Sequence, residues 1–385
     1  MSSDTITVAA VTDRRQKRAF LDVPQIVNAG DPSWIAPLRM TEAERLDRKR
    51  HPFYRYGEAE FFVAWRGGRP VGRISAQINR LYLERHQDST AHFGMFQADD
   101  DPAVVAALMR AAEGWAAERG LHRLAGPFSL SINEESGLLI DGYDTPPMVM
   151  MGHNGRHLSA RLEENGYGQD KRLLAYLWDL NGPLPDRLEH SLAKAGERYG
   201  KHLKVRPFDL GKMDREIGVV VEIFNDAWKG NWGFVPFTQY DVESMARDLK
   251  PLLVAEGGQI AEWDGEPIAM LVGLPDLNEA AVDLKGRLLP FGWLKLLYRL
   301  KVKRPTGGRI ALMGVREAWR GKPQGAFAVA LMLDRVRRAG QKHGIQRVEY
   351  SWILEDNHAM RGIIEASGLS AYKTYAIYGK SIGSK

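Results

Sequence analysis

Cysteine is absent from this sequence of 385 residues. Disulfides, thiolate nucleophiles and cysteine-based zinc sites are therefore excluded, and the composition fits a reducing compartment. Because the softest metal ligands are missing, we expect no metal cofactor. No stretch approaches about 18 uncharged apolar residues, so we expect no membrane-spanning helix. The N-terminus has no apolar core followed by a small-residue cleavage site, and we expect no signal peptide.

The excess of positive charge is small. Lysine and arginine number 53 against 48 aspartates and glutamates, which gives a formal net charge of +5. Such a balance is compatible with nucleic acid, anionic lipid, an anionic cofactor or no charged partner. The hydrophobic fraction of 44% is sufficient for two domains with separate cores.

The same order of predicted secondary-structure elements occurs twice in the sequence. Residues 61–78 and 259–274 each read as a β-hairpin that turns at a glycine. Residues 104–127 and 327–351 each read as an amphipathic helix that ends at a glycine and leads into a strand. A second helix, a glycine and β-rich runs complete each copy.

Equivalent glycines in the two copies are separated by similar distances along the chain. The separations are 197, 224 and 202 residues, for the pairs Gly68 and Gly265, Gly120 and Gly344, and Gly166 and Gly368. The near-constant offset predicts a tandem repeat of one α/β unit, with coincidence as the alternative. We divide the repeat into domains 1–183 and 184–385. The differences in offset indicate extra segments at 126–153 and 275–308.

One turn in the second copy has the composition of a phosphate-binding loop. After the strand at 309–315 the chain reads Arg320-Gly321-Lys322-Pro323-Gln324-Gly325-Ala326, and a later strand leads to Asn357, Ala359 and Gly368-Leu369. Over residues 205–380 this order resembles the GNAT superfamily of acyl-CoA-dependent N-acyltransferases, whose turn reads Arg/Gln-x-x-Gly-x-Gly/Ala. Over residues 55–180 the resemblance rests only on the order of the secondary-structure elements. It implies two tandem GNAT-like α/β (α+β) domains, each with a mixed, mostly antiparallel twisted sheet flanked by helices.

The resemblance implies acyl-CoA as co-substrate, held by the second domain. Backbone N–H groups at a helix N-terminus bind a pyrophosphate with the help of the helix dipole. Pro323 removes one N–H group but is favoured in a first helical turn, so we expect a working loop; an ordinary helix start is the alternative. The candidate cofactor-binding residues are Met313, Gly314, Val315, Arg320, Gly321, Lys322, Gln324, Gly325, Ala326 and Asn357.

The first copy has three aspartates where the second has this turn. Asp99, Asp100 and Asp101 would repel a phosphate, whereas they suit the cap and first turn of a helix. The first domain is therefore expected to be structural or to bind the acceptor. Within the extra segment 126–153, Asn133, Glu134 and Glu135 are candidate substrate-binding residues, because in the superfamily this region borders the acceptor site; a turn or helix cap is the alternative.

The resemblance implies direct attack of a neutral amine on the acyl thioester. This reaction needs a base, a backbone donor for the oxyanion near residues 313–315, and an acid for the thiolate. The family's acid tyrosine is replaced by Ile364, which leaves Tyr372, Tyr375 and Tyr378 as substitutes by proximity. The candidate catalytic residues, each more often structural in proteins, are Glu349, Glu355, His358 and Tyr375.

The second extra segment is basic and apolar at once. Residues 285–304 contain seven basic residues and no acidic residue, interleaved with leucines and aromatics. This pattern is typical of a helix lying in a membrane interface, with contact through 288–304, or of a lid packed on the domain. No nucleic-acid partner is expected, because no recognisable binding module accompanies the patch.

Taken together, these features predict a tandem GNAT-type N-acyltransferase that transfers an acyl group from acyl-CoA to an amine. The basic segment favours a lipid-like, sphingoid-type amine or a long acyl chain, and the layout is similar to bacterial acyltransferases of sphingolipid synthesis, the ceramide-synthase type. We expect a cytoplasmic protein that lies peripherally on the inner face of the membrane. The sequence leaves its oligomeric state open. Two alternatives stay open: a soluble acetyl-CoA N-acetyltransferase acting on a small amine or aminoacyl substrate, and a catalytically degenerate GNAT-fold binding protein.

Overall fold

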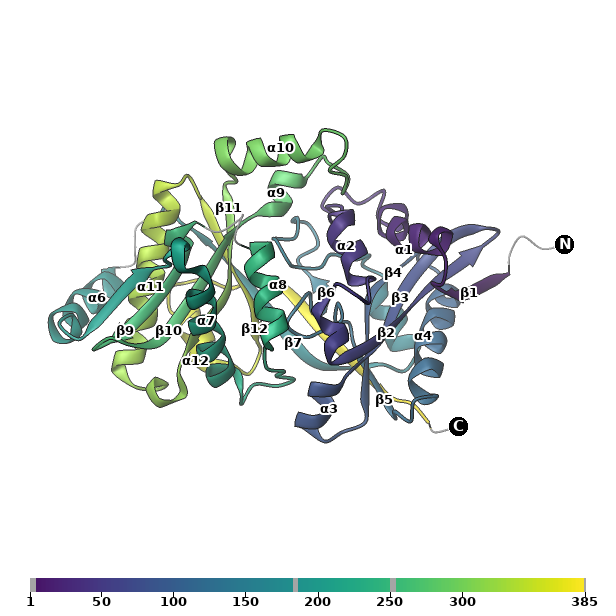
Figure 1. Cartoon of the computed structure of the whole chain (residues 1–385), viewed down its shortest axis with the longest axis horizontal. Helices are drawn as coiled ribbons and strands as arrows, with labels where there is room; N and C mark the ends of the chain where they lie inside the picture. Colours follow the sequence, from purple (N-terminus) through teal and green to yellow (C-terminus); the bar gives the residue numbers. More distant parts are fainter. Residues whose placement is uncertain (1–4, 183–185, 250–253, 384–385) are drawn as a thin grey trace. The chain divides into compact units, whose positions relative to one another are not determined.

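The computed structural model describes residues 5–182, 186–249 and 254–383 (Figure 1). The chain forms two compact units, each made from more than one segment. The first unit comprises Met1–Leu174, Ala281–Trp293 and Tyr372–Lys385, and the second comprises Ala175–Ala280 and Leu294–Ala371. The predicted boundary between residues 183 and 184 falls outside the described residues.

The first unit is built on a mixed sheet with the strand order β1-β2-β3-β4-β5-β13, and β6 pairs with β13. Neighbouring strands are antiparallel except β4 and β5, which are parallel. Its strands are β1 (Ile6–Ala10), β2 (Gly57–Arg66), β3 (Arg69–Asn79), β4 (Thr90–Ala98), β5 (Arg123–Gly126), β6 (Leu138–Asp141) and β13 (Ala371–Ser381). Its helices are α1 (Arg14–Val27), α2 (Arg39–Arg45), α3 (Arg80–His86), α4 (Pro102–Ala117) and α5 (Leu158–Glu164).

Two apolar clusters pack against this sheet because side chains alternate along its strands. In β2, Phe61 is buried with Phe20 of α1, whereas its neighbour Phe62 packs into a second cluster. That second cluster contains Ile74 of β3 and Leu108 of α4. Helices α1 and α4 therefore cover opposite faces, and each fully buried large side chain contributes about 1.5–3 kcal/mol to stability.

The second unit repeats the plan with the strand order β7-β12-β11-β10-β9-β8. From β8 to β11 the neighbouring strands are antiparallel, and β11 and β12 are parallel. Its strands are β8 (Leu203–Pro207), β9 (Gly258–Trp263), β10 (Glu266–Pro275), β11 (Gly307–Val315) and β12 (Arg347–Leu354). Its helices are α6 (Asp186–Tyr199), α7 (Met213–Trp228), α8 (Gln239–Leu249), α11 (Pro323–Lys342) and α12 (His358–Glu365). The unit boundaries cut β7 (Gly168–Asp179), α9 (Leu277–Ala281) and α10 (Gly292–Tyr298), and they leave Ala371, the first residue of β13, in the second unit.

The predicted repeat and fold class are confirmed. The series β1-α1-α2-β2-β3-β4-α4-β5-α5-β7 is matched by β8-α7-α8-β9-β10-β11-α11-β12-α12-β13. The glycines predicted to end helices have φ between 74° and 84°, a backbone conformation that favours glycine: Gly120, Gly166, Gly344 and Gly368.

The last strands do not follow the contiguous ranges 1–183 and 184–385. Strand β13, the final strand of the second copy, pairs with β5 and β6 in the sheet of the first unit. The second half of β7 belongs in turn to the second unit, where β7 neighbours β12. Each unit is thus completed by a strand that belongs to the other copy of the repeat.

Candidate functional site

In the second unit, strands β11 and β12 part halfway along their length. Their parallel pairing runs from Gly307–Arg347 to Ile310–Tyr350, although β11 continues to Val315 and β12 to Leu354. Ala311 is an extra residue against β10, a β-bulge of the kind that redirects a strand. Among the described strands none pairs with this edge of β11 beyond Ile310, so backbone groups there face the space between the two strands. Met313, Gly314 and Val315 lie in this stretch.

The predicted turn leads directly into α11. Pro323 is the first helical residue, as expected from its place in the sequence, and Lys322 is the N-cap without a side-chain cap hydrogen bond. Gln324 and Gly325 follow in the first turn, where backbone N–H groups have no acceptor within a helix. The helix dipole adds partial positive charge at this end, and Lys322 is exposed. This end of α11 therefore has the character of an anion-binding site.

The end of helix α7 fixes the shape of the turn. The Asp226 carboxylate accepts a hydrogen bond from the backbone N–H of Glu317 at 2.7 Å, and this bond is the main cause that lowers the pKa of Asp226. The Arg320 guanidinium donates to the carbonyl oxygen of Ala227. Arg320 therefore fastens the turn to α7 in addition to bringing charge.

Gly325 permits the close approach of the turn to α11. A Cβ atom at this position would lie 2.3 Å from the carbonyl oxygen of Trp319 and 3.2 Å from Val315 Cγ1. The neighbouring Gly321 has a φ of 74°, and the Lys322 ammonium lies 5.5 Å from the centre of the Trp319 ring. The two glycines of the turn thus serve different needs, one for space and one for backbone conformation.

The predicted family signature around Asn357 forms the start of a helix. Asn357 caps α12, because its side chain accepts a hydrogen bond from the backbone N–H of Met360 at 3.2 Å. Glu355 is half-buried just before the cap and His358 is exposed at the first helical residue. Ile364, which replaces the family's acid tyrosine, is buried in the same helix. Tyr375 is buried in the part of β13 that belongs to the first unit, and its role as acid stays a prediction.

Glu349 belongs to a buried polar cluster at the point where β11 and β12 part. The Ser351 hydroxyl donates to the Glu349 carboxylate, which is fully buried. Arg309 donates from Nε to Ser351 Oγ at 2.8 Å and from Nη2 to the Ser351 carbonyl oxygen at 3.1 Å. Sequence reasoning missed Arg309 and Ser351, although the alternation of polar residues in these β-rich runs is a signal for one polar strand face. The cluster places a hydroxyl next to a carboxylate, an arrangement that can relay a proton.

The first unit fills the corresponding place with its own chain. Strands β4 and β5 pair only from Thr90–Arg123 to His92–Ala125, after which Phe128 N–H donates to the Phe93 carbonyl oxygen at 2.8 Å. A Cβ at Gly94 would lie 1.6 Å from the Phe128 carbonyl oxygen, so the backbone of Phe128 lies directly against β4. At the start of α4, Asp101 accepts from Ala103 N–H at 2.8 Å. The predicted aspartate cap is confirmed for Asp101, whereas Asp99 and Asp100 precede the helix, whose first turn contains no acidic residue.

The predicted substrate-binding carboxylates of the first unit are held by an arginine of α2. Arg45 donates from Nε to Glu134 at 3.0 Å and from Nη2 to Glu135 at 3.3 Å. It also donates to Glu42, which accepts a further hydrogen bond from Arg73 at 2.8 Å. Burial acts to raise the pKa of Glu42, but the two guanidinium groups outweigh it and lower that pKa. Asn133 N–H donates to Ser131 Oγ at 3.3 Å in the same loop. Sequence reasoning missed the two arginines and Glu42.

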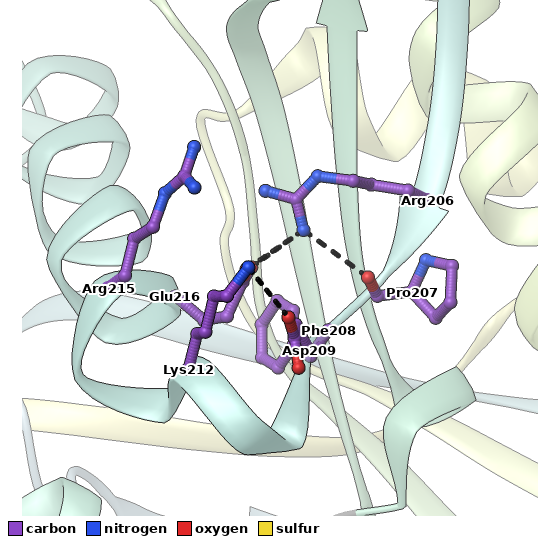
Figure 2. Close-up of a pocket in the computed structure, with 7 residues that line it drawn as sticks. All are labelled: Arg206, Pro207, Phe208, Asp209, Lys212, Arg215 and Glu216. Carbon is purple, nitrogen blue, oxygen red and sulfur yellow. Dashed lines mark hydrogen bonds and ion pairs between the residues drawn. The ribbon is translucent and has the colours of Figure 1, made fainter.

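The second unit also has a surface hollow (Figure 2). It has a volume of about 300 Å³ and is lined by Arg206, Pro207, Phe208, Asp209, Lys212, Arg215 and Glu216. Arg206 donates to both Glu216 oxygens, at 3.0 and 2.9 Å, and to Glu262 at 2.7 Å. Charges of both signs are thus paired at this hollow, and it contains none of the predicted site residues.

Histidines and acids do not gather into a metal site in the described part of the chain. Sequence reasoning overlooked one pair with metal-ligand spacing, His153 and His157. In the structure His153 Nε2 lies 2.8 Å from Asp31 Oδ2, whereas His157 Nε2 lies 3.0 Å from the carbonyl oxygen of Ala98. The two rings serve separate hydrogen bonds, and the absence of a metal cofactor stays a prediction. Among the described helices, none has the length and apolar character to cross a membrane.

Two units with this order of strands and helices define the class of the protein by its fold, the tandem GNAT-fold proteins. A solved tandem GNAT protein from the clavulanic acid biosynthesis pathway is similar with a TM-score of 0.57 and 13% identity, over 98% of this chain and 99% of that one. A GCN5-related N-acetyltransferase from Sphaerobacter thermophilus gives a TM-score of 0.51 at 14% identity, over 98% and 96%. These likenesses show the fold.

The sequence comparison narrows the class to a family. The chain is 43% identical over 378 residues to the bacterial ceramide synthase of Caulobacter vibrioides, covering 98% of both chains. It is 40% identical to Protein YghO of Escherichia coli, over 97% of this chain and 95% of that one. No family model matches the sequence. The protein belongs to the bacterial ceramide synthase family and is an acyl-CoA-dependent acyltransferase of GNAT type.

Proposed function

We propose that the protein transfers the acyl group of a long-chain acyl-CoA to the amino group of a lipid-like, sphingoid-type amine. The observation that carries this proposal is the parting of β11 and β12 beside an α11 N-terminus whose N-cap makes no side-chain bond. Membership of the bacterial ceramide synthase family supports a lipid acceptor.

The second unit holds acyl-CoA in this proposal. The pyrophosphate lies at the turn and first residues of α11, against the backbone of Gly321, Gln324, Gly325 and Ala326, with Lys322 and Arg320 supplying positive charge. The thioester end enters between β11 and β12. There a backbone N–H of Met313, Gly314 or Val315 donates to the oxyanion that develops on the acyl carbonyl. Asn357 supports this site by capping α12 rather than by contact with the ligand.

The chemical step is a direct transfer. The neutral amine nitrogen attacks the carbonyl carbon, the carbon–sulfur bond breaks, and the amine loses a proton while the CoA thiolate gains one. We assign the amine proton to Glu349 through the Ser351 hydroxyl, because these two groups are already hydrogen-bonded where the strands part. Glu355 and His358 are the alternative bases near the start of α12. With Ile364 in place of the acid tyrosine, the thiolate takes its proton from water in this proposal, and Tyr375 is the alternative acid.

The first unit binds or positions the acceptor in this proposal and the second unit binds acyl-CoA, which are the roles predicted for domains 1–183 and 184–385. Its own chain closes the place that corresponds to the CoA site, which leaves this unit to other tasks. Asn133, Glu134 and Glu135 are the proposed acceptor contacts, since carboxylates attract an ammonium group. Contact with a membrane surface through residues 288–304, on the inner face, belongs to the same proposal.

Product analysis by mass spectrometry tests the proposal. The purified protein is mixed with palmitoyl-CoA or acetyl-CoA and with sphinganine or a small soluble amine. We expect N-palmitoyl sphinganine as the main product. Acetyl transfer to the small amine alone would favour the soluble acetyltransferase, and binding of acyl-CoA without any product would favour a binding protein.

The assignment of the base has its own test. Ser351→Ala should lower kcat about 10²-fold and change the pH profile of kcat while KM for acyl-CoA stays within about twofold, because the relay acts on proton transfer. Ser367→Ala is the matched control, since its hydroxyl bonds only to carbonyl oxygens of α12 in the described contacts. An unchanged pH profile in Ser351→Ala would refute the relay.

A further inference from the structure

Seven large apolar side chains are exposed along one short stretch of the chain. They are Leu289 (81%), Phe291 (73%), Val302 (65%), Tyr298 (58%), Trp293 (48%), Leu297 (48%) and Leu294 (47%). Single exposed apolar residues are ordinary on a protein surface, whereas a contiguous group marks an interaction site. Residues 289–302, with the basic residues that flank them, are called the apolar ridge below.

The helix within the apolar ridge turns its apolar side chains outward. Helix α10 covers Gly292–Tyr298 and continues as a π-helical turn over Arg299–Lys303. Trp293, Leu294, Leu297 and Tyr298 are exposed and share one face at helical spacing, whereas Leu296 is half-buried on the other. The lid expected as an alternative would bury this face, and the side chains of the face are instead open to solvent.

Basic side chains lie at both ends of the apolar ridge. Lys285 and Arg287 precede it, Lys301 lies at its end, and Lys303 and Arg304 follow it, all of them exposed. Residues 285–304 contain no acidic residue. Along the chain, the exposed apolar residues thus lie between two groups of cations.

We infer that the apolar ridge is a docking surface for a bilayer rich in anionic lipid. This inference rests on the proposed function, in which the acceptor is a lipid. A bilayer interface offers both contacts that the ridge needs: acyl chains for the apolar face and anionic headgroups for the cations at its ends. Trp293 and Tyr298 are residues that favour the boundary between these two layers.

The composition argues against the other occupants of such a surface. A protein partner would bury the centre of its interface among apolar residues depleted in lysine, whereas three lysines border this short ridge. A nucleic acid would use the cations and leave exposed leucines such as Leu289 and Leu297 in water. The bilayer accounts for both features.

The expected strength follows from the same residues. Each lysine or arginine at an anionic surface contributes about fivefold to the partition coefficient, so three of them contribute about 100-fold. Each large apolar side chain that enters the interface contributes on the order of tenfold. The charged part is screened by salt and the apolar part is not.

Vesicle sedimentation with the full-length protein, without CoA or amine, tests the inference. Vesicles of phosphatidylcholine alone are compared with vesicles that contain about one third phosphatidylglycerol, at low and high salt. We expect binding to the anionic vesicles that weakens with salt. The triple variant Lys301→Gln, Lys303→Gln and Arg304→Gln should lose about 100-fold in affinity, and Phe291→Ser with Leu297→Ser should also lose about 100-fold.

Matched controls carry the same changes elsewhere on exposed residues. Arg14→Gln, Lys49→Gln and Arg50→Gln remove three charges, and Met40→Ser with Leu210→Ser remove two apolar side chains. Both should bind vesicles like the unchanged protein, and circular dichroism checks that every variant is folded.

The outcomes separate this inference from the proposed reaction. The docking inference would be overturned if the ridge variants and the control variants bound anionic vesicles equally well. It would also be overturned if the unchanged protein did not bind vesicles. A dimer in analytical ultracentrifugation that Phe291→Ser and Leu297→Ser dissolve would overturn it in favour of a second copy as the occupant. Vesicle binding by a protein that forms no N-acyl product would leave the docking surface standing and refute the reaction instead.

Discussion

Replacement of Gly325 by alanine is the sharpest test of the proposed CoA loop. The added Cβ would meet the carbonyl oxygen of Trp319 at 2.3 Å, and this oxygen belongs to backbone that cannot rotate away. The turn must therefore move from α11 by about 1 Å, the scale of displacement that costs about 100-fold where a ligand is held by fixed groups. We expect the Kd for CoA to rise 10- to 100-fold, a loss of about 1.4–2.7 kcal/mol in binding free energy.

Stability should respond much less than binding to this change. Overpacking costs about 1–3 kcal/mol, and alanine regains up to about 1 kcal/mol over glycine inside a helix. The free energy of unfolding should therefore fall by about 0–2 kcal/mol. Calorimetric titration with CoA and urea unfolding measure the two quantities on the same samples.

Gly114→Ala is the matched control in the equivalent helix of the first unit. No atom lies within 4 Å of a Cβ built at Gly114, so this variant should gain about 0.5–1 kcal/mol in stability and bind CoA unchanged. If Gly325→Ala bound CoA as tightly as the unchanged protein, the pyrophosphate would not lie at this turn, and the assignment of the loop would be wrong.

Three further changes concern the first unit. Gly94→Ala sets a Cβ 1.6 Å from the Phe128 carbonyl oxygen and should cost about 3 kcal/mol of unfolding free energy by urea titration, with an unchanged CoA Kd for the folded protein. Glu42→Gln removes the carboxylate between two buried guanidinium groups and should cost about 3–5 kcal/mol; a loss below 1 kcal/mol would contradict this reading of the network. Burial lowers the pKa of His92 to about 4. As the pH falls, this histidine is therefore protonated in the unfolded chain before it is protonated in the folded one. The free energy of unfolding should be highest above about pH 6.5 and should decline toward pH 4. The free energy of unfolding should be about 2 kcal/mol lower at pH 5 than at pH 7.5. In His92→Phe, thermal unfolding at the two pH values should no longer show this difference.

The repeat was predictable because it depends on local signals. Glycine at a helix end and a two-residue turn between β-rich runs are written in a few adjacent residues, and Gly120, Gly166, Gly344 and Gly368 all have the positive φ that such a stop requires. Asp101 as the cap of α4 and Pro323 as the first residue of α11 follow from the same kind of evidence. The phosphate-loop assignment itself came from a family resemblance and not from the local signals.

The exchanged strands and the buried charges were not predictable from such signals. A strand such as β13 carries no mark of its partner, because backbone hydrogen bonds are the same for any neighbour with a matching edge. Arg45 and Glu134 are 89 residues apart, and only the folded unit brings them together. No local sequence signal distinguishes the two arginines of this network from surface cations, and only their burial in the folded unit shows that they hold carboxylates in place.

The two copies of the fold differ mainly in the hydrogen-bond partners of equivalent backbone groups. In each copy a parallel pair of strands parts next to the start of a long helix, which leaves strand edges and helix N–H groups in need of partners. In the first copy Phe128 and Asp101 supply those partners from within the chain. In the second copy the N-cap is Lys322, whose side chain has no acceptor to offer, so we expect the free groups to bind a ligand that brings its own oxygens. We therefore expect a single acyl-CoA per chain. A calorimetric stoichiometry of two would contradict it, because a second molecule would have to displace both Phe128 and Asp101.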